Sequence, residues 1–195
     1  MKIKLIASKI KGYLKELTII TAGVLIALLI SNYKENSQAR AYYRTSVETV
    51  KNEVQSNFSN LKSIIETQNV LIDSIKKYSA DTITISDLII EKGGGIQGIT
   101  LSNSGLEFYK KNQINAIDFK MMSRLIEIES TSKLIDTKMD KLMDYLYPNL
   151  FVASEESKKL IVLHLKNLLN SELKLEQLYK EFITEYDLEK NSPNN

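Results

Sequence analysis

The stretch Leu17–Ile30, with the sequence LTIITAGVLIALLI, contains fourteen residues and no charge. Ser31-Asn32-Tyr33 extends the uncharged run to seventeen residues, which as a helix covers roughly 25 Å at about 1.5 Å per residue. That length is at the short end of what spans the hydrocarbon core of a bilayer. We therefore expect a single transmembrane anchor at residues 17–33, which includes Leu17, Gly23, Ala27, Ile30 and Tyr33.

The charges around this run predict its orientation. Five lysines precede it, and no acid occurs before Glu16; the lysines are Lys2, Lys4, Lys9, Lys11 and Lys15. After the run, Lys34 and Arg40 are accompanied by Glu35. Because lysine and arginine are retained on the cytoplasmic side, residues 1–16 are expected in the cytoplasm. The rest of the chain is then expected outside, in the periplasm if the membrane is the inner membrane of a Gram-negative bacterium.

Three other interpretations of the run are open. A cleaved signal peptide has the same basic start, but Leu28–Asn32 offers no small-x-small cleavage site. A buried core helix also fits fourteen apolar residues, although the lysine cluster and the all-round apolar surface disfavour it. The segment Gly12–Leu17 superficially resembles a type IV pilin processing site, but its glutamate comes one residue too early. Gly23 and Ala27 form a small-xxx-small pair, which is typical both of helix association and of ordinary membrane helices.

The segment from Lys34 to Tyr78 contains neither Gly nor Pro and repeats its apolar residues every seven positions. Alternating steps of four and three indicate a coiled-coil seam on one long helix that continues from the anchor as a stalk. The seam comprises Val47, Val50, Val54, Leu61, Ile64, Leu71 and Ile75. Asn57 and Gln68 occupy polar seam positions, where they either fix the register or face solvent in a loose bundle.

The pattern breaks at residues 79–100. Ser86 is a candidate cap for a short helix through Glu91. The glycines Gly93, Gly95 and Gly98 then match G-x-G-x-x-G, but no strand is indicated before them and no helix opens cleanly after them. We therefore expect a flexible loop and no cofactor site.

Two further long helices are expected. One runs from about Asn115 to Leu146 with a heptad seam, and the Tyr147-Pro148-Asn149 segment ends it. The other begins after a capping Ser154. Its apolar residues are Leu160, Leu163, Leu168, Leu175, Leu178, Phe182 and Tyr186. With a compact loop between the first two seams, the sequence predicts an all-α fold with an antiparallel helical hairpin in a bundle over residues 34–190 and a disordered tail at 191–195.

No set of residues predicts catalysis or metal binding. The chain has no cysteine and one histidine, His164, which lies between leucines on a predicted helix. Asp136, Asp140 and Asp144 alternate with lysines and indicate a solvated face. The residues after the anchor are slightly acidic in sum, which disfavours nucleic-acid binding.

Several short segments resemble a family of uncharacterised single-pass membrane proteins, a domain of unknown function widespread in Bacteroidota. They are Glu16-Leu17, Gly23–Leu28, Ile30–Glu35 and Leu101–Leu106. Tyr33 stands where that family would have tryptophan, and the Gly93–Gly98 loop has no counterpart in it. The resemblance implies a bacterial inner-membrane protein and implies no activity.

These features favour a non-enzymatic envelope protein whose anchored bundle binds a protein partner or associates with itself. The expected partners are the lipid bilayer and a protein or a second copy of the chain, and not a nucleic acid. The alternatives are a periplasmic sensory module that binds a small ligand and works with a separate signalling partner, and a pilin-like stem protein.

Overall fold

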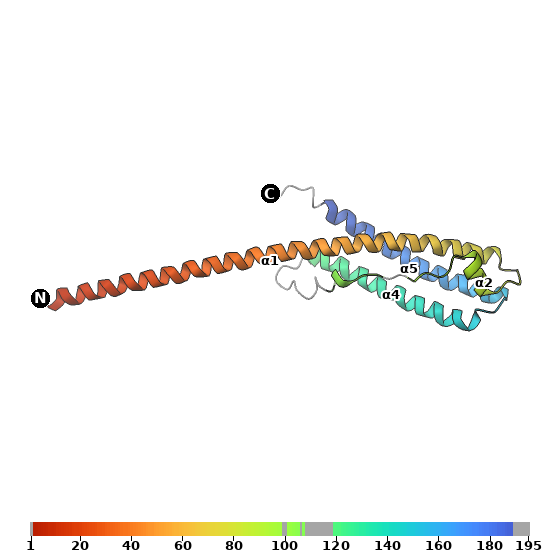
Figure 1. Ribbon diagram of the computed structural model, residues 1–195, viewed down its shortest axis with the longest axis horizontal. Helices are drawn as coiled ribbons and strands as arrows, with labels where there is room; N and C mark the ends of the chain where they lie inside the picture. Colours follow the sequence, from red (N-terminus) through yellow and green to blue (C-terminus); the bar gives the residue numbers. More distant parts are fainter. Residues whose placement is uncertain (1, 99–100, 106, 108–118, 189–195) are drawn as a thin grey trace. The chain divides into compact units, whose positions relative to one another are not determined.

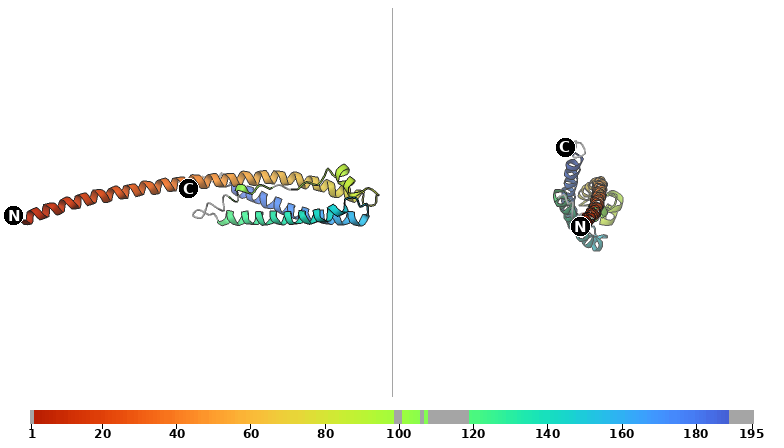
Figure 2. Two further views of the ribbon diagram at one scale, coloured as in Figure 1. Left: turned by 60° about the horizontal axis from the view of Figure 1, so that its bottom comes forward. Right: turned by 90° about the vertical axis from the view of Figure 1, so that its left-hand side faces the viewer.

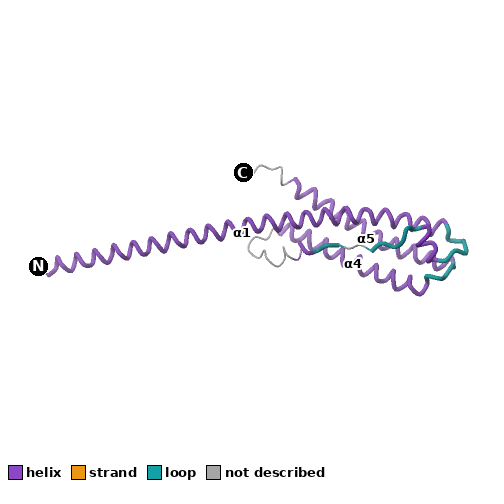
Figure 3. Tube along the Cα trace, viewed as in Figure 1, coloured by secondary structure: helices purple, strands orange, loops and turns teal. Residues whose placement is uncertain are grey.

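The computed structural model describes residues 2–98, 101–105, 107 and 119–188 of the chain (Figure 1). All elements in these residues are helical: α1 (Lys2–Lys77), the short α2 (Ile85–Asp87), the π-helix η1 (Leu88–Lys92), α4 (Phe119–Asn149) and α5 (Glu155–Leu188). Figure 3 shows helices and loops and no strand in the part of the chain that it colours. The predicted all-α fold is confirmed.

Two compact units divide the chain, Met1–Thr45 and Ser46–Asn195. Helix α1 contributes to both. Its residues from Gly12 to Tyr42 are all exposed, whereas buried side chains recur from Ser46 onward. The second compact unit thus begins at Ser46.

The second unit is a bundle of α4, α5 and the part of α1 after Thr45, which lie side by side in the left view of Figure 2. Each helix buries the face on which its apolar residues recur at steps of three and four. Fully buried side chains include Leu61, Leu71 and Ile75 of α1, Met121, Leu125 and Leu142 of α4, and Ile161, Leu165 and Phe182 of α5.

The seam residues of α1 lie on the side that faces α4 and α5. Six of the seven are buried and Val47 is half-buried; the six are Val50, Val54, Leu61, Ile64, Leu71 and Ile75. The two polar seam positions are buried as well, since Asn57 is 3% exposed and Gln68 is 2% exposed. The alternative that Asn57 and Gln68 face solvent is therefore wrong.

Helix α5 runs antiparallel to both other long helices, as three contacts on each side establish. These are Lys51–Tyr186, Gln68–Glu172 and Lys158–Tyr78 with α1, and Arg124–Glu185, Glu127–Lys174 and Lys138–Asn167 with α4. It follows that α1 and α4 are parallel to each other.

The antiparallel hairpin is therefore formed by α4 and α5, and not by the first two long helices. The prediction of a compact loop between those two is wrong. After η1 the described loop residues run back along α1 (Figure 3). A Cβ at Gly93 would contact Leu71, and a Cβ at Gly105 would contact Thr49. This return allows two successive long helices to pack in parallel.

The ends of the helices agree with the sequence in part. Ser154 caps α5 as predicted, because its Oγ accepts from the Ser157 N–H at 3.2 Å. The cap of α2 is Thr84 and not Ser86: Thr84 Oγ1 accepts from the Asp87 N–H at 3.2 Å. Ser86 instead donates its backbone N–H to Leu150. The expected helix start near Asn115 and the tail at 191–195 lie outside the described residues.

On α5, two residues of the predicted apolar set face outward. Leu160 is 39% exposed and Leu163 is 62% exposed, while Ile161 and Leu165 are fully buried. The true buried line passes through Ile161, Leu165, Leu168, Glu172, Leu175, Tyr179, Phe182 and Tyr186. Glu172 lies at the centre of this line. A pattern based on apolar residues alone therefore does not follow the line.

Candidate functional site

The anchor residues lie on the exposed part of α1. Leu17, Ile30 and Tyr33 are 61%, 63% and 79% exposed, and a side chain at Gly23 would meet no atom within 4 Å. The hydroxyl of Thr18 donates to the carbonyl of Leu14 at 2.8 Å, one turn back in the same helix. Such internal bonding is what a polar side chain needs where water is absent.

Among the described residues, α1 alone contains a stretch long and apolar enough to cross a membrane, with a mean hydropathy of 1.9. None of that stretch is buried within the chain. The alternative of a buried core helix is therefore wrong for the single chain. A candidate membrane-spanning helix near the N-terminus fits a membrane-anchored helical protein.

The second candidate feature is a pair of α1 side chains that hold the returning segment. Asn57 donates from Nδ2 to the Ser102 carbonyl at 2.8 Å and accepts at Oδ1 from the Ser102 N–H at 3.1 Å. One turn earlier, Glu53 Oε2 accepts from the Gly105 N–H at 2.7 Å and from Ser102 Oγ at 3.0 Å. An added Cβ at Gly105 would lie 3.3 Å from Thr49, so the segment passes close to α1. We call residues 101–105 the strap.

The third feature is a buried acid between α1 and α5. Glu172 is fully buried and accepts a hydrogen bond from Gln68 Nε2 at 2.8 Å. Burial raises the pKa of Glu172 to about 7, although the bond from Gln68 acts in the opposite direction. The amide oxygen of Gln68, Oε1, and the second carboxylate oxygen of Glu172, Oε2, have no hydrogen-bond partner.

The fourth feature is a buried lysine at the C-terminal end of α1. Lys158 is fully buried, and its Nζ donates to the carbonyls of Tyr78, Ser79 and Asp81 at 3.1, 3.4 and 2.5 Å. These carbonyls belong to the turn that directly follows α1, since α1 ends at Lys77. Lys158 therefore ties α5 to this turn.

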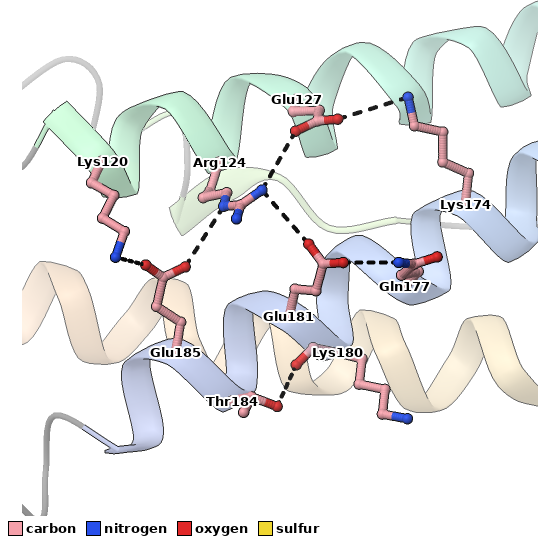
Figure 4. Close-up of polar contacts among 9 residues, drawn as sticks. All are labelled: Lys120, Arg124, Glu127, Lys174, Gln177, Lys180, Glu181, Thr184 and Glu185. Carbon is pink, nitrogen blue, oxygen red and sulfur yellow. Dashed lines mark hydrogen bonds and ion pairs between the residues drawn. The ribbon is translucent and has the colours of Figure 1, made fainter.

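A network of charges joins α4 to α5 at the surface (Figure 4). Arg124 lies 3.6 Å from both Glu181 and Glu185 of α5, and Lys174 of α5 lies 3.7 Å from Glu127 of α4. Lys120 also pairs with Glu185. Next to this network is an open groove of about 820 Å³ lined by Arg124 and residues of α5.

The single histidine and the three aspartates of α4 lie apart from the features above. His164 stacks on Tyr145 with ring centroids 5.3 Å apart. Asp136, Asp140 and Asp144 are exposed on α4. In the part of the chain that the structure describes, no three metal-ligating side chains come together.

The glycine motif lies in a loop that follows η1. Gly94 and Gly95 have φ angles of 73° and 91°, which side chains rarely adopt. The Gly95 N–H donates to Ile89 at 2.9 Å and closes the turn after the π-helix. These glycines shape the turn at which the chain starts its return along α1.

Sequence reasoning missed Glu172, Lys158 and Glu53. Each is a charged residue on a helix, and such residues are normally exposed. For Lys158 and Glu172 the sequence contains one signal, which is their helical position: both lie three or four residues from buried apolar residues of α5.

No protein-family model matches this chain, and no curated protein or solved structure is significantly similar to it.

Proposed function

We propose that this chain is an envelope protein of the bacterial inner membrane, anchored by residues 17–33, whose helical bundle acts by binding a protein partner or a second copy of itself. The observation that carries the proposal is the exposed apolar face of α1 between Lys15 and Lys34, on a helix that also supplies one third of a folded bundle. Exposure of so many apolar side chains in water is unfavourable, and lipid removes that penalty.

Binding rather than catalysis is supported by what the interior polar groups do. Asn57 and Glu53 hold the strap, and Lys158 holds the turn after α1, so each of these side chains is engaged in holding the fold. The bundle also displays large apolar side chains to solvent, including Phe119 at 83%, Phe151 at 85% and Leu163 at 62% exposed. Binding of another protein to such an exposed apolar surface is favourable because it removes apolar area from water.

The proposed orientation rests on the five lysines before the anchor, which favour a cytoplasmic N-terminus and therefore a periplasmic bundle. The resemblance to a Bacteroidota membrane family supports the same location. Because the chain has no cysteine, single cysteines can report the side of the membrane without background. In intact cells with a permeabilised outer membrane, a membrane-impermeant maleimide should label Leu173→Cys in the bundle and should spare Ser8→Cys.

Labelling of both positions only after lysis, or of Ser8→Cys alone, would contradict the orientation. The binding role is tested separately by cross-linking in native membranes. Discrete oligomers or one specific cross-linked partner are expected, and a chain that remains entirely monomeric would count against the proposal.

A further inference from the structure

A carboxyl group lies in the core of the bundle, at the centre of the buried line of α5. Glu172 is 0% exposed, and Gln68 opposite it on α1 is 2% exposed. Gln68 Nε2 donates to Glu172 Oε1 at 2.8 Å. The other two oxygens of the pair, Gln68 Oε1 and Glu172 Oε2, are buried without a hydrogen-bond donor. An ionised Glu172 can supply no donor, so in that state both oxygens stay unsatisfied.

Among the described residues, the one other buried charged side chain is Lys158, which is bonded to the carbonyls of Tyr78, Ser79 and Asp81. The buried side chains nearest to the pair along α1 and α5 are apolar, namely Ile64, Leu71, Leu168 and Leu175. On α4 the buried polar residues among those described are the neutral Thr131 and Ser132.

The charged side chains on the same three helices are engaged elsewhere or lie nearer the surface. Lys138 of α4 is bonded to Asn167 and Ser171, at 2.8 and 2.7 Å. Lys174 of α5 is 61% exposed and pairs with Glu127. Glu176 of α5 is partly exposed, and Glu66 of α1 is exposed.

A proton on Glu172 resolves the hydrogen-bond deficit. The protonated oxygen becomes a donor, and the acceptor that lacks one within the pair is Gln68 Oε1. A carboxylic acid and a primary amide can then bond reciprocally, as donor and acceptor on each side. Loss of the proton leaves a charge in an apolar layer, which is unfavourable unless the layer opens to water.

We propose that Gln68 and Glu172 form a proton-controlled lock between α1 and α5, closed when Glu172 is protonated and loosened when it is ionised. The inference concerns the bundle and holds whether or not residues 17–33 lie in a membrane. The ligand of this site is a proton, and its effect is to set how tightly the C-terminal helix packs on the helix that carries the anchor.

The direction of the pH dependence follows from the two states of the acid. Its pKa is about 7 in the fold, against an ordinary value of 4.5. The folded state therefore holds its proton over a range where the unfolded state has lost it, and stability from this group falls as the pH rises from about 4.5 to about 7. Between pH 5 and pH 8 the folding equilibrium constant should decrease by about 70-fold through Glu172 alone.

The test compares denaturant unfolding of the full chain in detergent micelles at pH 5 and pH 8, followed by circular dichroism. In Glu172→Gln the second amide can donate to Gln68 Oε1 at every pH, so this variant should lose the pH-dependent component and be more stable than the wild type at pH 8. Glu176→Gln removes the same charge one turn further along α5 and should keep the wild-type pH dependence.

Parallel pH profiles for the wild type and Glu172→Gln would overturn the proposal. Infrared spectroscopy of the wild type provides a measurement that needs no variant. A protonated-carboxyl band should persist at pH 6 and disappear by about pH 8.5, as expected for a carboxyl with a pKa near 7. Absence of that band at pH 6 would also overturn the proposal, even if the variant fails to fold.

Discussion

Single polar residues inside the bundle are bonded to partners that are far away in the chain. Asn57 reaches the strap 45 residues on, and Lys158 reaches carbonyls about 80 residues before it. The heptad pattern could identify Asn57 and Gln68 as polar positions in an apolar seam. It could not identify their partners, because the pattern describes only neighbouring residues in the sequence and the partners are far away in the chain. Whether such a residue is buried depends on which helix packs against it.

Lys158 predicts a specific loss of stability. Lys158→Met keeps the unbranched apolar part of the side chain and removes the charged donor from the carbonyls of Tyr78, Ser79 and Asp81. Hydrogen bonds to charged groups contribute about 1.5–3 kcal/mol, so we expect a loss of about 2 kcal/mol in the free energy of unfolding. Urea unfolding followed by circular dichroism measures it. Lys159→Met is the control, because Lys159 is exposed and pairs only within its own helix, and equal losses in both variants would contradict the role of Lys158.

Gly93 predicts a second effect, which arises from packing. A Cβ at this position would lie 2.2 Å from Leu71 Cδ1, and Leu71 is 1% exposed in the core. Gly93→Ala therefore forces Leu71 into another rotamer and should cost about 1–3 kcal/mol. Gly98→Ala is the matched control, since its Cβ would meet nothing within 4 Å. Thermal unfolding should distinguish them, and an unchanged melting temperature for Gly93→Ala would show that Leu71 moves freely.

Helices were predictable from the sequence because each long one has a buried face with a regular period. The exceptions have physical causes. The phase of α5 was misjudged because Glu172 interrupts its buried line and exposed leucines lie beside it. The direction of α4 was misjudged because the strap has no period of its own and is held by side chains of α1, which only the folded chain brings near. A loop that is held in place by side chains of a distant helix has little in its own sequence that predicts its path.

The strap predicts local rather than global loosening. Asn57→Ala removes both hydrogen bonds to Ser102 and leaves a small cavity beside it. Amide hydrogen exchange at Ser102 and Gly105 should increase by more than about tenfold, which corresponds to about 1.4 kcal/mol of local opening free energy. Asn60→Ala, on an exposed face of the same helix, should leave exchange in the strap unchanged. Increased exchange throughout α4 and α5 would instead mean that Asn57 stabilises the whole bundle.

On the scale of the whole molecule, α1 combines two kinds of surface. Its first part is apolar and exposed, and its second part buries one face in a bundle. Hydropathy alone predicted the first part, because a membrane span is a property of composition and length. The packing of the bundle could not be predicted from hydropathy. Its buried acid and buried lysine are polar residues, and a hydropathy pattern assigns such residues to the surface.

An arginine at the centre of the apolar run should separate these two parts. Leu25→Arg places a charge in the middle of residues 17–33, where insertion into a bilayer costs about 2.5–3.5 kcal/mol for a charged residue. Because the run is already at the short end of the length that spans a bilayer core, we expect a large fraction of the protein to become extractable from membranes by alkaline carbonate.

Val70→Arg is the matched control: Val70 is an apolar residue of the same helix, 57% exposed like Leu25 at 56%, but it lies in the bundle. It should leave membrane retention unchanged. If both variants remained in the membrane fraction, the anchor would lie elsewhere in the chain; if both were released, the bundle itself would contribute to membrane attachment through the face that carries Val70.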